Sequence, residues 1–263
     1  MISEFLSISL HRHVQFEPVS WEDCDQPRSA RFQDVYRPAV GGLTQARDVF
    51  MRGCGLPQRW SDKSTFRILE TGFGLGLNFL ASWQAWTADQ RRCEQLEFCS
   101  IEAFPVDPGQ IMRNVAALGL QTDAAHELSA MAEQLAQQWG SVQPGWNTLG
   151  FADDRVRLNV LVGDVNEMLP QVVGPIDAIY LDGFAPSRNP EMWADKVMQA
   201  LAGLSLPGTT LATYTVARTV RDGLAAAGFD AQRLLGTPPK RHRLQAVFVG
   251  KGTSTATAPD PWR

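Results

Sequence analysis

Cysteine is scarce in this sequence, and the cysteine pairs that would bind zinc or perform redox chemistry are missing. Only four cysteines occur among 263 residues, and no two of them form a CxxC pair. No combination of cysteines and the four histidines has the spacing of zinc ligands, so we expect no metal site. In a chain of this length, such cysteines are typical of reduced, mostly buried thiols in a cytosolic protein. They are Cys24, Cys54, Cys93 and Cys99.

Long apolar runs and an excess of positive charge are also missing. Every apolar run is short and interrupted by polar residues, which argues against a membrane-spanning helix. The N-terminus lacks a basic lead, an apolar stretch and a cleavage site, so we expect no secretion signal and a cytoplasmic location. The formal net charge of −4 is unlike that of most nucleic-acid-binding proteins. Contact with a nucleic acid would need a local basic patch, for which residues 238–243 (PPKRHR) are a candidate.

The sequence does contain strand-like and helix-like segments in alternation. This order is typical of an α/β protein whose mostly parallel sheet is covered by helices on both faces. We expect strands at 67–71, 96–104, 156–164, 176–184 and 208–215, helices at 77–86, 165–172, 190–204 and 216–228, and an antiparallel hairpin within 231–250. The main domain is predicted at 36–250, with a helical insertion at about 105–153, after an N-terminal extension (1–35) with a hairpin and before a tail or linker (251–263).

Three glycines, Gly72, Gly74 and Gly76, follow the first of these strands in the segment ETGFGLGLNFL. A glycine-rich turn between a strand and a helix lets a ligand approach the backbone closely. The spacing GxGxG differs from the dinucleotide fingerprint GxGxxG, and no GKS or GKT follows as in a P-loop. Glu70, just ahead of the glycines, suits a cation better than a phosphate. S-adenosyl-L-methionine carries an ammonium and a sulfonium group, so we expect it as cofactor, with Glu70 holding its amino-acid end directly or through water.

Two further acids at strand ends fit the same cofactor. Glu102 could accept hydrogen bonds from both ribose hydroxyls, and Asp164 could accept one from the adenine amino group. Each hydrogen bond to a charged group contributes about 1.5–3 kcal/mol. The alternative is that these acids only cap turns or helix N-termini.

The segment YLDGFAPSRNPEMW, residues 180–193, ends the fourth expected strand and is predicted to form a rigid loop that faces the cofactor. We refer to it as the reactive loop. It is loosely similar to the loop of amino-group methyltransferases in which an acid or Asn precedes two prolines and an aromatic residue. Asp182 is then the catalytic candidate: it would orient an amine and stabilise the positive charge that develops on nitrogen, with general-base duty as second choice. The alternative is that Asp182 caps a turn and that Phe184 and Trp193 belong to the core.

Six segments together closely resemble the methyltransferase domain of the MnmC family of tRNA-modification enzymes, over about residues 34–250. They occur in the order DVYRPAVGGLTQARDVFM, ETGFGLGLNFLASWQAW, SIEAFP, GDVNEMLP, YLDGFAPSRNPEMW and GTTLATYTVARTVRDGLAAAGF. The resemblance implies a Rossmann-like class I fold dependent on S-adenosyl-L-methionine. It also implies conversion of 5-aminomethyl-(2-thio)uridine at the tRNA wobble position to the 5-methylaminomethyl form. Bifunctional members add a C-terminal FAD-dependent oxidase, which we expect this chain to lack.

The resemblance also implies roles for individual residues. The cofactor would be bound by Glu70, Gly72, Gly74, Gly76, Asn78, Glu102, Asp164 and Asp182. The modified base would face Phe184, Pro186, Arg188 and Asn189, and stacking on Phe184 or Trp193 would offset its removal from the anticodon stack. Candidates for phosphate contacts are Arg188, Arg218, Arg221, Lys240 and Arg241. Thr44 and Gln45 stand where the family usually has an acidic pair.

Three alternatives stay open at this point. One is a methyltransferase of small-molecule amines on the same fold, which the negative net charge favours. Another is a non-catalytic protein that binds RNA or a protein partner. The third is an aminopropyltransferase, whose decarboxylated cofactor would not need an acid for the amino-acid end.

Overall fold

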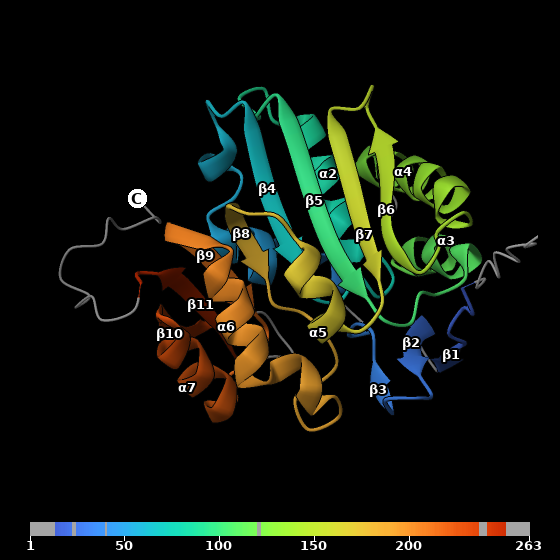
Figure 1. Cartoon of the computed structure of the whole chain (residues 1–263). Helices are drawn as coiled ribbons and strands as arrows, with labels where there is room; N and C mark the ends of the chain where they lie inside the picture. The colour runs from blue at the N-terminus through green and yellow to red at the C-terminus, as the bar shows by residue number, and fades with distance from the viewer. Residues whose placement is uncertain (1–13, 23–24, 40, 120–121, 237–240, 251–263) are drawn as a thin grey trace, which may run out of the picture.

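The computed structural model describes residues 14–22, 25–39, 41–119, 122–236 and 241–250 and places an eight-stranded sheet at the centre (Figure 1). The strand order is β10-β11-β9-β8-β4-β5-β7-β6, and the five strands β9, β8, β4, β5 and β7 run parallel. They are β4 (Thr65–Glu70), β5 (Gln95–Glu102), β7 (Val156–Val162), β8 (Ile176–Tyr180) and β9 (Ser205–Thr213). At one edge, β10 (Phe229–Leu235) and β11 (His242–Phe248) form the expected antiparallel hairpin. The mostly parallel α/β fold is thereby confirmed.

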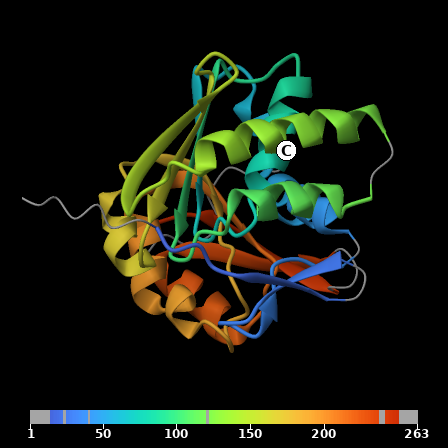
Figure 2. The same ribbon diagram turned by 90° about the vertical axis from the view of Figure 1, so that its right-hand side faces the viewer.

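Helices cover both faces of this sheet, which explains why its central strands are apolar almost throughout. One face carries α2 (Leu77–Ala88), α3 (Pro108–Ala116) and α4 (Asp123–Trp139), and α3 and α4 lie side by side (Figure 2). The short helical segments α1 (Gly42–Gln45), η2 (Ala46–Met51), η3 (Arg52–Cys54) and η4 (Gln58–Trp60) precede β4. The other face carries α5 (Val165–Met168), η5 (Leu169–Gln171), η6 (Pro190–Trp193), α6 (Asp195–Gly203) and α7 (Arg218–Ala227).

Alternate residues of the parallel strands feed two separate cores. Ile68, Phe98 and Tyr180 pack into the core beneath α2 and α4, whereas Leu69 and Ile179 pack beneath α6 and α7. Successive side chains of a strand point to opposite faces, so each buried strand serves both cores. Three of the cysteines, Cys54, Cys93 and Cys99, are buried free thiols as expected, and Cys24 lies outside the described residues.

The prediction of a helical insertion over 105–153 is wrong in its last part. After α4, residues Gly145–Phe151 form β6, which pairs antiparallel with β7 at the sheet edge. Its side chains alternate, with Leu149 and Phe151 buried and Trp146 exposed. Three consecutive residues with positive φ, Ala152, Asp153 and Asp154, then turn the chain into β7. The helical reading missed the change of period from 3.6 to 2.

The N-terminal extension contains a small sheet of its own. Its strands are β1 (Val19–Glu22), β2 (Gln26–Ser29) and β3 (Asp34–Val35), and β1 and β2 form a hairpin. The division of the chain near residues 35 and 250 stays a prediction. Among the described residues, no helix combines the length and the apolar character needed to cross a bilayer.

Candidate active site

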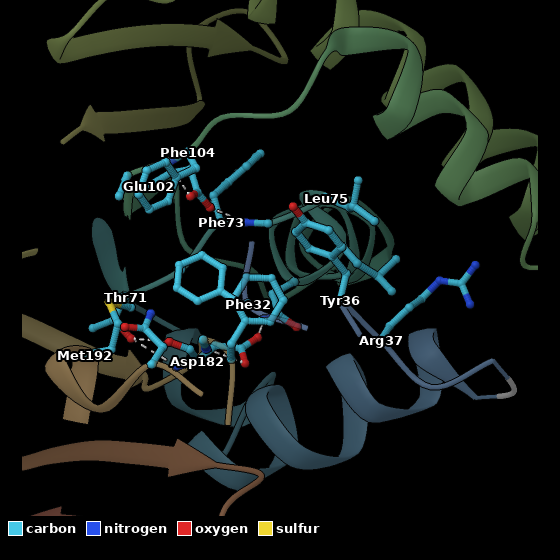
Figure 3. Close-up of a pocket in the computed structure, with 18 of the residues that line it drawn as sticks. Phe32, Tyr36, Arg37, Thr71, Phe73, Leu75, Glu102, Phe104, Asp182 and Met192 are labelled. Carbon is cyan, nitrogen blue, oxygen red and sulfur yellow. Dashed lines mark hydrogen bonds between the residues drawn. The ribbon is translucent and has the colours of Figure 1, made fainter. Parts of the chain in front are cut away.

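A cavity lies at the carboxyl ends of β4, β5 and β8, where ligands bind in sheets of this type. Figure 3 shows Phe32, Tyr36, Glu102 and Asp182 around it. Its walls come from the N-terminal segment, the glycine loop, the end of β5 and the reactive loop. The lining includes Glu17, Phe32, Tyr36, Arg37, Gln45, Thr71, Gly72, Phe73, Gly74, Asn78, Glu102, Phe104, Gly163, Val165, Asp182, Gly183, Phe184, Asn189 and Met192.

The three glycines of the loop are needed for different reasons. A Cβ on Gly72 would lie 3.3 Å from the Asp182 carbonyl oxygen, so a side chain would push the loop away from the end of β8. Gly74 has φ of +54°, and its Cβ would lie 3.3 Å from the ring of Tyr36. Gly76 has φ of +74° and starts α2. Gly72 and Gly74 line the cavity, whereas Gly76 is not part of the lining.

Glu102 ties the glycine loop to the end of β5. Its carboxylate accepts hydrogen bonds from the Gly74 N–H at 2.7 Å and from the Phe104 N–H at 2.9 Å. Burial raises the pKa of Glu102 above its ordinary value, and these two bonds act against that shift. Glu102 lines the cavity beside Ala103 and Phe104, and each carboxylate oxygen can accept a second hydrogen bond.

Asp182 follows β8 and is partly exposed to the cavity. Its Oδ1 accepts from the Gly183 N–H at 2.8 Å, and its Oδ2 accepts from Nδ2 of Asn78, also at 2.8 Å. The Thr71 hydroxyl donates to the Asp182 carbonyl oxygen at 2.7 Å and fastens the loop to β4. Burial raises the pKa of Asp182 to about 6, so its carboxylate form predominates at neutral pH.

The rest of the reactive loop is held from several sides. Tyr214 donates through its hydroxyl to the Gly183 carbonyl at 2.7 Å, and the Trp193 indole N–H donates to the Phe184 carbonyl at 2.9 Å. The Ala185 N–H donates to the Asp34 carboxylate of β3 at 2.8 Å. These bonds fix the backbone around Asp182.

Aromatic rings from the N-terminal segment cover the reactive loop. Phe32 stacks on Phe184 with ring centroids 4.6 Å apart, and Tyr36 meets Phe184 edge-on at 5.1 Å. Phe32 also contacts Phe104 at the end of β5. The phenol of Tyr36 stays neutral, because burial raises its pKa above the ordinary value of 10. The cavity thus has a polar floor and an aromatic cover.

Comparison with known proteins gives the chain a family. Residues 126–248 match the model of a family described as S-adenosyl-L-methionine-dependent methyltransferases. The chain is 47% identical, over 88% of its length, to the tRNA 5-methylaminomethyl-2-thiouridine biosynthesis bifunctional protein MnmC of Delftia acidovorans. It is 48% identical, over 89% of its length, to the protein of the same name from Cupriavidus metallidurans. The chain belongs to this methyltransferase family.

These matches confirm the resemblance to the MnmC family that the motifs indicated. The chain spans about a third of its curated relatives, 35% of the Delftia protein and 34% of the Cupriavidus protein. The crystal structure of MnmC2 from Aquifex aeolicus has the same fold, with a TM-score of 0.67 and 20% identity over 89% of this chain and 71% of that one. A methyltransferase assignment also argues against the aminopropyltransferase alternative.

In this methyltransferase, Glu70 does not line the cavity as we expected. It is buried, its Oε2 accepts from the Ser100 hydroxyl at 2.7 Å, and its Oε1 accepts from Asn78 at 2.9 Å. Ser100 faces Glu70 across the β4–β5 register, so the acid turns into the sheet rather than toward the ligand. Contact of Glu70 with the amino-acid end of the cofactor, directly or through water, stays a prediction, and the bonds to Ser100 and Asn78 favour an indirect role.

Asp164 shows the capping role that was its alternative. Its Oδ1 accepts from the Asn166 N–H at 2.8 Å at the start of α5. The side chain is exposed and does not line the cavity, although its neighbours Gly163 and Val165 do. Contact with adenine stays a prediction that rests on its second oxygen, Oδ2.

The predicted substrate residues separate into two groups. Phe184 and Asn189 line the cavity, whereas Pro186 and the exposed Arg188 do not. Trp193 is 6% exposed and packs in the core beneath α6 and α7, which favours its alternative role as a core residue. Stacking of a base on it stays a prediction. Arg241 is exposed, and Arg218 and Arg221 lie at the start of α7, where Arg218 pairs with Asp222. Lys240 lies outside the described residues.

Sequence reasoning missed the cavity residues before β4. Phe32, Tyr36 and Arg37 come from an irregular segment with neither helical nor strand period. The buried Arg37 guanidinium donates to Asn114 Oδ1 at 2.6 Å and to the carbonyls of Pro38 and Ala39, which ties the segment to α3. The nearest signal was the run DVYRPAVGG, which belongs to the family resemblance. It marked the segment as part of the family pattern but did not place it beside the cavity.

Proposed function

We propose that this chain methylates the amine of 5-aminomethyl-(2-thio)uridine at the wobble position of tRNA and yields the 5-methylaminomethyl form. The observation that carries the proposal is the position of Asp182, a carboxylate at the cavity floor between the glycine loop and the aromatic cover. The names of the relatives agree, because making 5-methylaminomethyl-2-thiouridine requires a methylated amine. The prior action of a FAD-dependent oxidase stays a prediction.

The residues of the cavity fit S-adenosyl-L-methionine. Gly72 and Gly74 carry no side chain, so the loop backbone can lie close to Asp182 and Tyr36, and Glu102 offers carboxylate acceptors suited to hydroxyl groups. Asp182 and Asn78 add acceptors beside the glycine loop, where a cationic amino-acid end would lie. When bound, the cofactor supplies an electrophilic methyl group on a sulfonium sulfur.

Asp182 would accept an N–H of the incoming amine and hold its lone pair toward the methyl group. Positive charge would develop on that nitrogen as it accepts the methyl group that the cofactor would supply. A carboxylate beside that nitrogen would stabilise the charge. The proton that nitrogen then loses passes to solvent, or to Asp182 if this residue also serves as base.

The outer face of the site would contact RNA. Leu244 pairs with Thr213, so the start of β11 lies beside the carboxyl end of β9. Arg241 and His242 therefore lie at the same end of the sheet as Asp182, where the parallel strands finish. Arg188 adds an exposed guanidinium on the reactive loop. Guanidinium groups form bidentate contacts with phosphate, and the net charge of −4 makes such a local group necessary.

The test is methyl transfer from labelled S-adenosyl-L-methionine to tRNA that lacks the wobble methyl group, followed by nucleoside analysis. We expect labelled 5-methylaminomethyl-uridine with the native chain. Asp182→Ala should lower turnover at saturating S-adenosyl-L-methionine by at least about a hundredfold. Turnover that persists in this variant would refute the role of Asp182. Cofactor binding without transfer to any tRNA would refute the substrate, and small amines would be tried next.

A further inference from the structure

Asn78 lies between two acids and donates to both of them. Its Nδ2 is 2.9 Å from Glu70 Oε1 and 2.8 Å from Asp182 Oδ2. A side-chain amide has two N–H donors, so these two bonds use both. Asn78 occupies the second position of α2, whose start is fixed by the positive φ of Gly76. The side chain therefore joins the strand end at Glu70 to the reactive loop.

The two acids determine which way the amide faces. Turning it over would bring Oδ1 within 3 Å of both carboxylate oxygens, so that four lone pairs would face one another without a proton. A protonated Glu70 leaves this choice unchanged, because the Asp182 carboxylate oxygen, 2.8 Å from the same amide atom, still requires an N–H there. A proton on Oε2 can be donated to the Ser100 hydroxyl, 2.7 Å away, and Oε1 then still accepts from Asn78.

With its donors committed, Asn78 presents its carbonyl oxygen. The residue lines the cavity, and within the described part of the chain Oδ1 has no hydrogen-bond partner. The oxygen stands next to the Asp182 carboxylate beside the glycine loop. A neutral acceptor and a negatively charged acceptor side by side suit a group with several N–H donors and a positive charge.

We propose that Asn78 Oδ1 accepts a hydrogen bond from an amine or ammonium N–H of a bound reactant. Glu70 is then a positioning residue, which never touches the ligand and acts only by orienting Asn78. The N–H donor is either the α-ammonium of S-adenosyl-L-methionine or the amine to be methylated. The second source rests on the proposed function, whereas the first does not.

A double-mutant cycle tests this coupling with Glu70→Leu, Asn78→Ala and the combined variant. The readouts are the dissociation constant of S-adenosyl-L-methionine and the KM of tRNA that carries 5-aminomethyluridine. Asn78→Ala should raise one of these two constants about tenfold or more, because a hydrogen bond to a charged donor is lost. Glu70→Leu should raise the same constant. In a chain that already carries Asn78→Ala, it should raise that constant by less than about threefold.

Glu70→Gln supplies the conservative control. Its Oε1 can accept from Asn78 and its Nε2 can donate to Ser100, so it should stay within about threefold of the native chain. If Glu70 instead bound the ligand through its negative charge, Glu70→Gln would impair binding as Glu70→Leu does. Thermal unfolding of each variant shows whether it is folded. If Glu70→Leu does not fold, the proposal is tested by comparing Glu70→Gln, expected to bind like the native chain, with Asn78→Ala, expected to bind more weakly.

The two arms separate the sources of the N–H donor. A weaker cofactor affinity assigns Oδ1 to the ammonium of S-adenosyl-L-methionine, and a higher KM with intact cofactor affinity assigns it to the target amine. The proposal is overturned if Asn78→Ala changes neither readout, if the two substitutions act independently, or if Glu70→Gln behaves like Glu70→Leu. Should the native chain not methylate the tRNA, the proposed function fails and the cofactor arm alone decides.

Discussion

At the scale of single residues, Glu70 is an acid that burial holds near its neutral form. Removal from water raises its pKa from 4.5 to about 8, and the nearby Asp182 charge adds to the shift. In the unfolded chain Glu70 loses its proton near 4.5, whereas in the folded chain it does so near 8. The folded state binds more protons in this range, so its stability falls as pH rises from about 4.5 to 8.

Glu70→Gln removes this dependence because the amide does not ionise. We expect its free energy of unfolding to exceed that of the native chain by an amount that grows between pH 5 and pH 8. Urea unfolding at several pH values measures the difference, and Glu191→Gln at an exposed acid serves as control. A difference that does not change with pH would contradict the buried, proton-binding state of Glu70.

The sequence located several chemical residues but not all of their partners. Glu70, Glu102 and Asp182 were predicted from their places at strand ends, and all three lie around the glycine loop. The direction of Glu70 was not predictable, because it depends on Ser100, which only the strand register brings opposite. A linear pattern gives the end of a strand and leaves open which neighbour its last side chain meets.

At the scale of elements, the turn between β4 and α2 depends on a glycine in left-handed conformation. Gly74→Ala should destabilise the fold by about 1–2 kcal/mol through the positive φ alone. The added methyl group also presses on Tyr36, so affinity for S-adenosyl-L-methionine should fall. Isothermal calorimetry and thermal unfolding measure the two effects.

Gly203→Ala is the matched control for this substitution. Gly203 ends α6, its φ is not positive, and a Cβ there would meet nothing within 4 Å. We expect neither a loss of stability nor a change in cofactor affinity. Equal behaviour of the two variants would show that the loop tolerates a side chain at Gly74.

Elements with a strong period were predictable, and elements that depend on distant partners were not. The five parallel strands and the final hairpin were expected within a few residues of their observed bounds. The edge strand β6 was missed because a helical insertion precedes it, and its alternation of Leu149 and Phe151 with exposed residues spans only seven positions. The strands β2 and β3 are short, and their position depends on contacts with the reactive loop.

At the scale of the whole molecule, binding of tRNA should depend on a few positive charges at one edge. Arg188→Ala and Arg241→Ala should each raise the KM of tRNA and reduce the slope of log affinity against log salt by about one. Arg91→Ala should change neither, because this exposed residue lies beyond the far end of α2. Filter binding at three salt concentrations measures the slopes, and equal effects of all three variants would refute a local patch.

The link between β3 and the reactive loop has a consequence for synthesis of the chain. The hydrogen bond from Ala185 to Asp34 spans 151 residues, and the stacked rings of Phe32 and Phe184 are similarly far apart in the sequence. β4 likewise reaches its neighbour β8 only after β5, α4 and β7 have been made. Contacts of such long separation form slowly. On the ribosome, the aromatic rings of the N-terminal segment therefore lack their partner until Phe184 has emerged, and the cavity forms only after the reactive loop has been made.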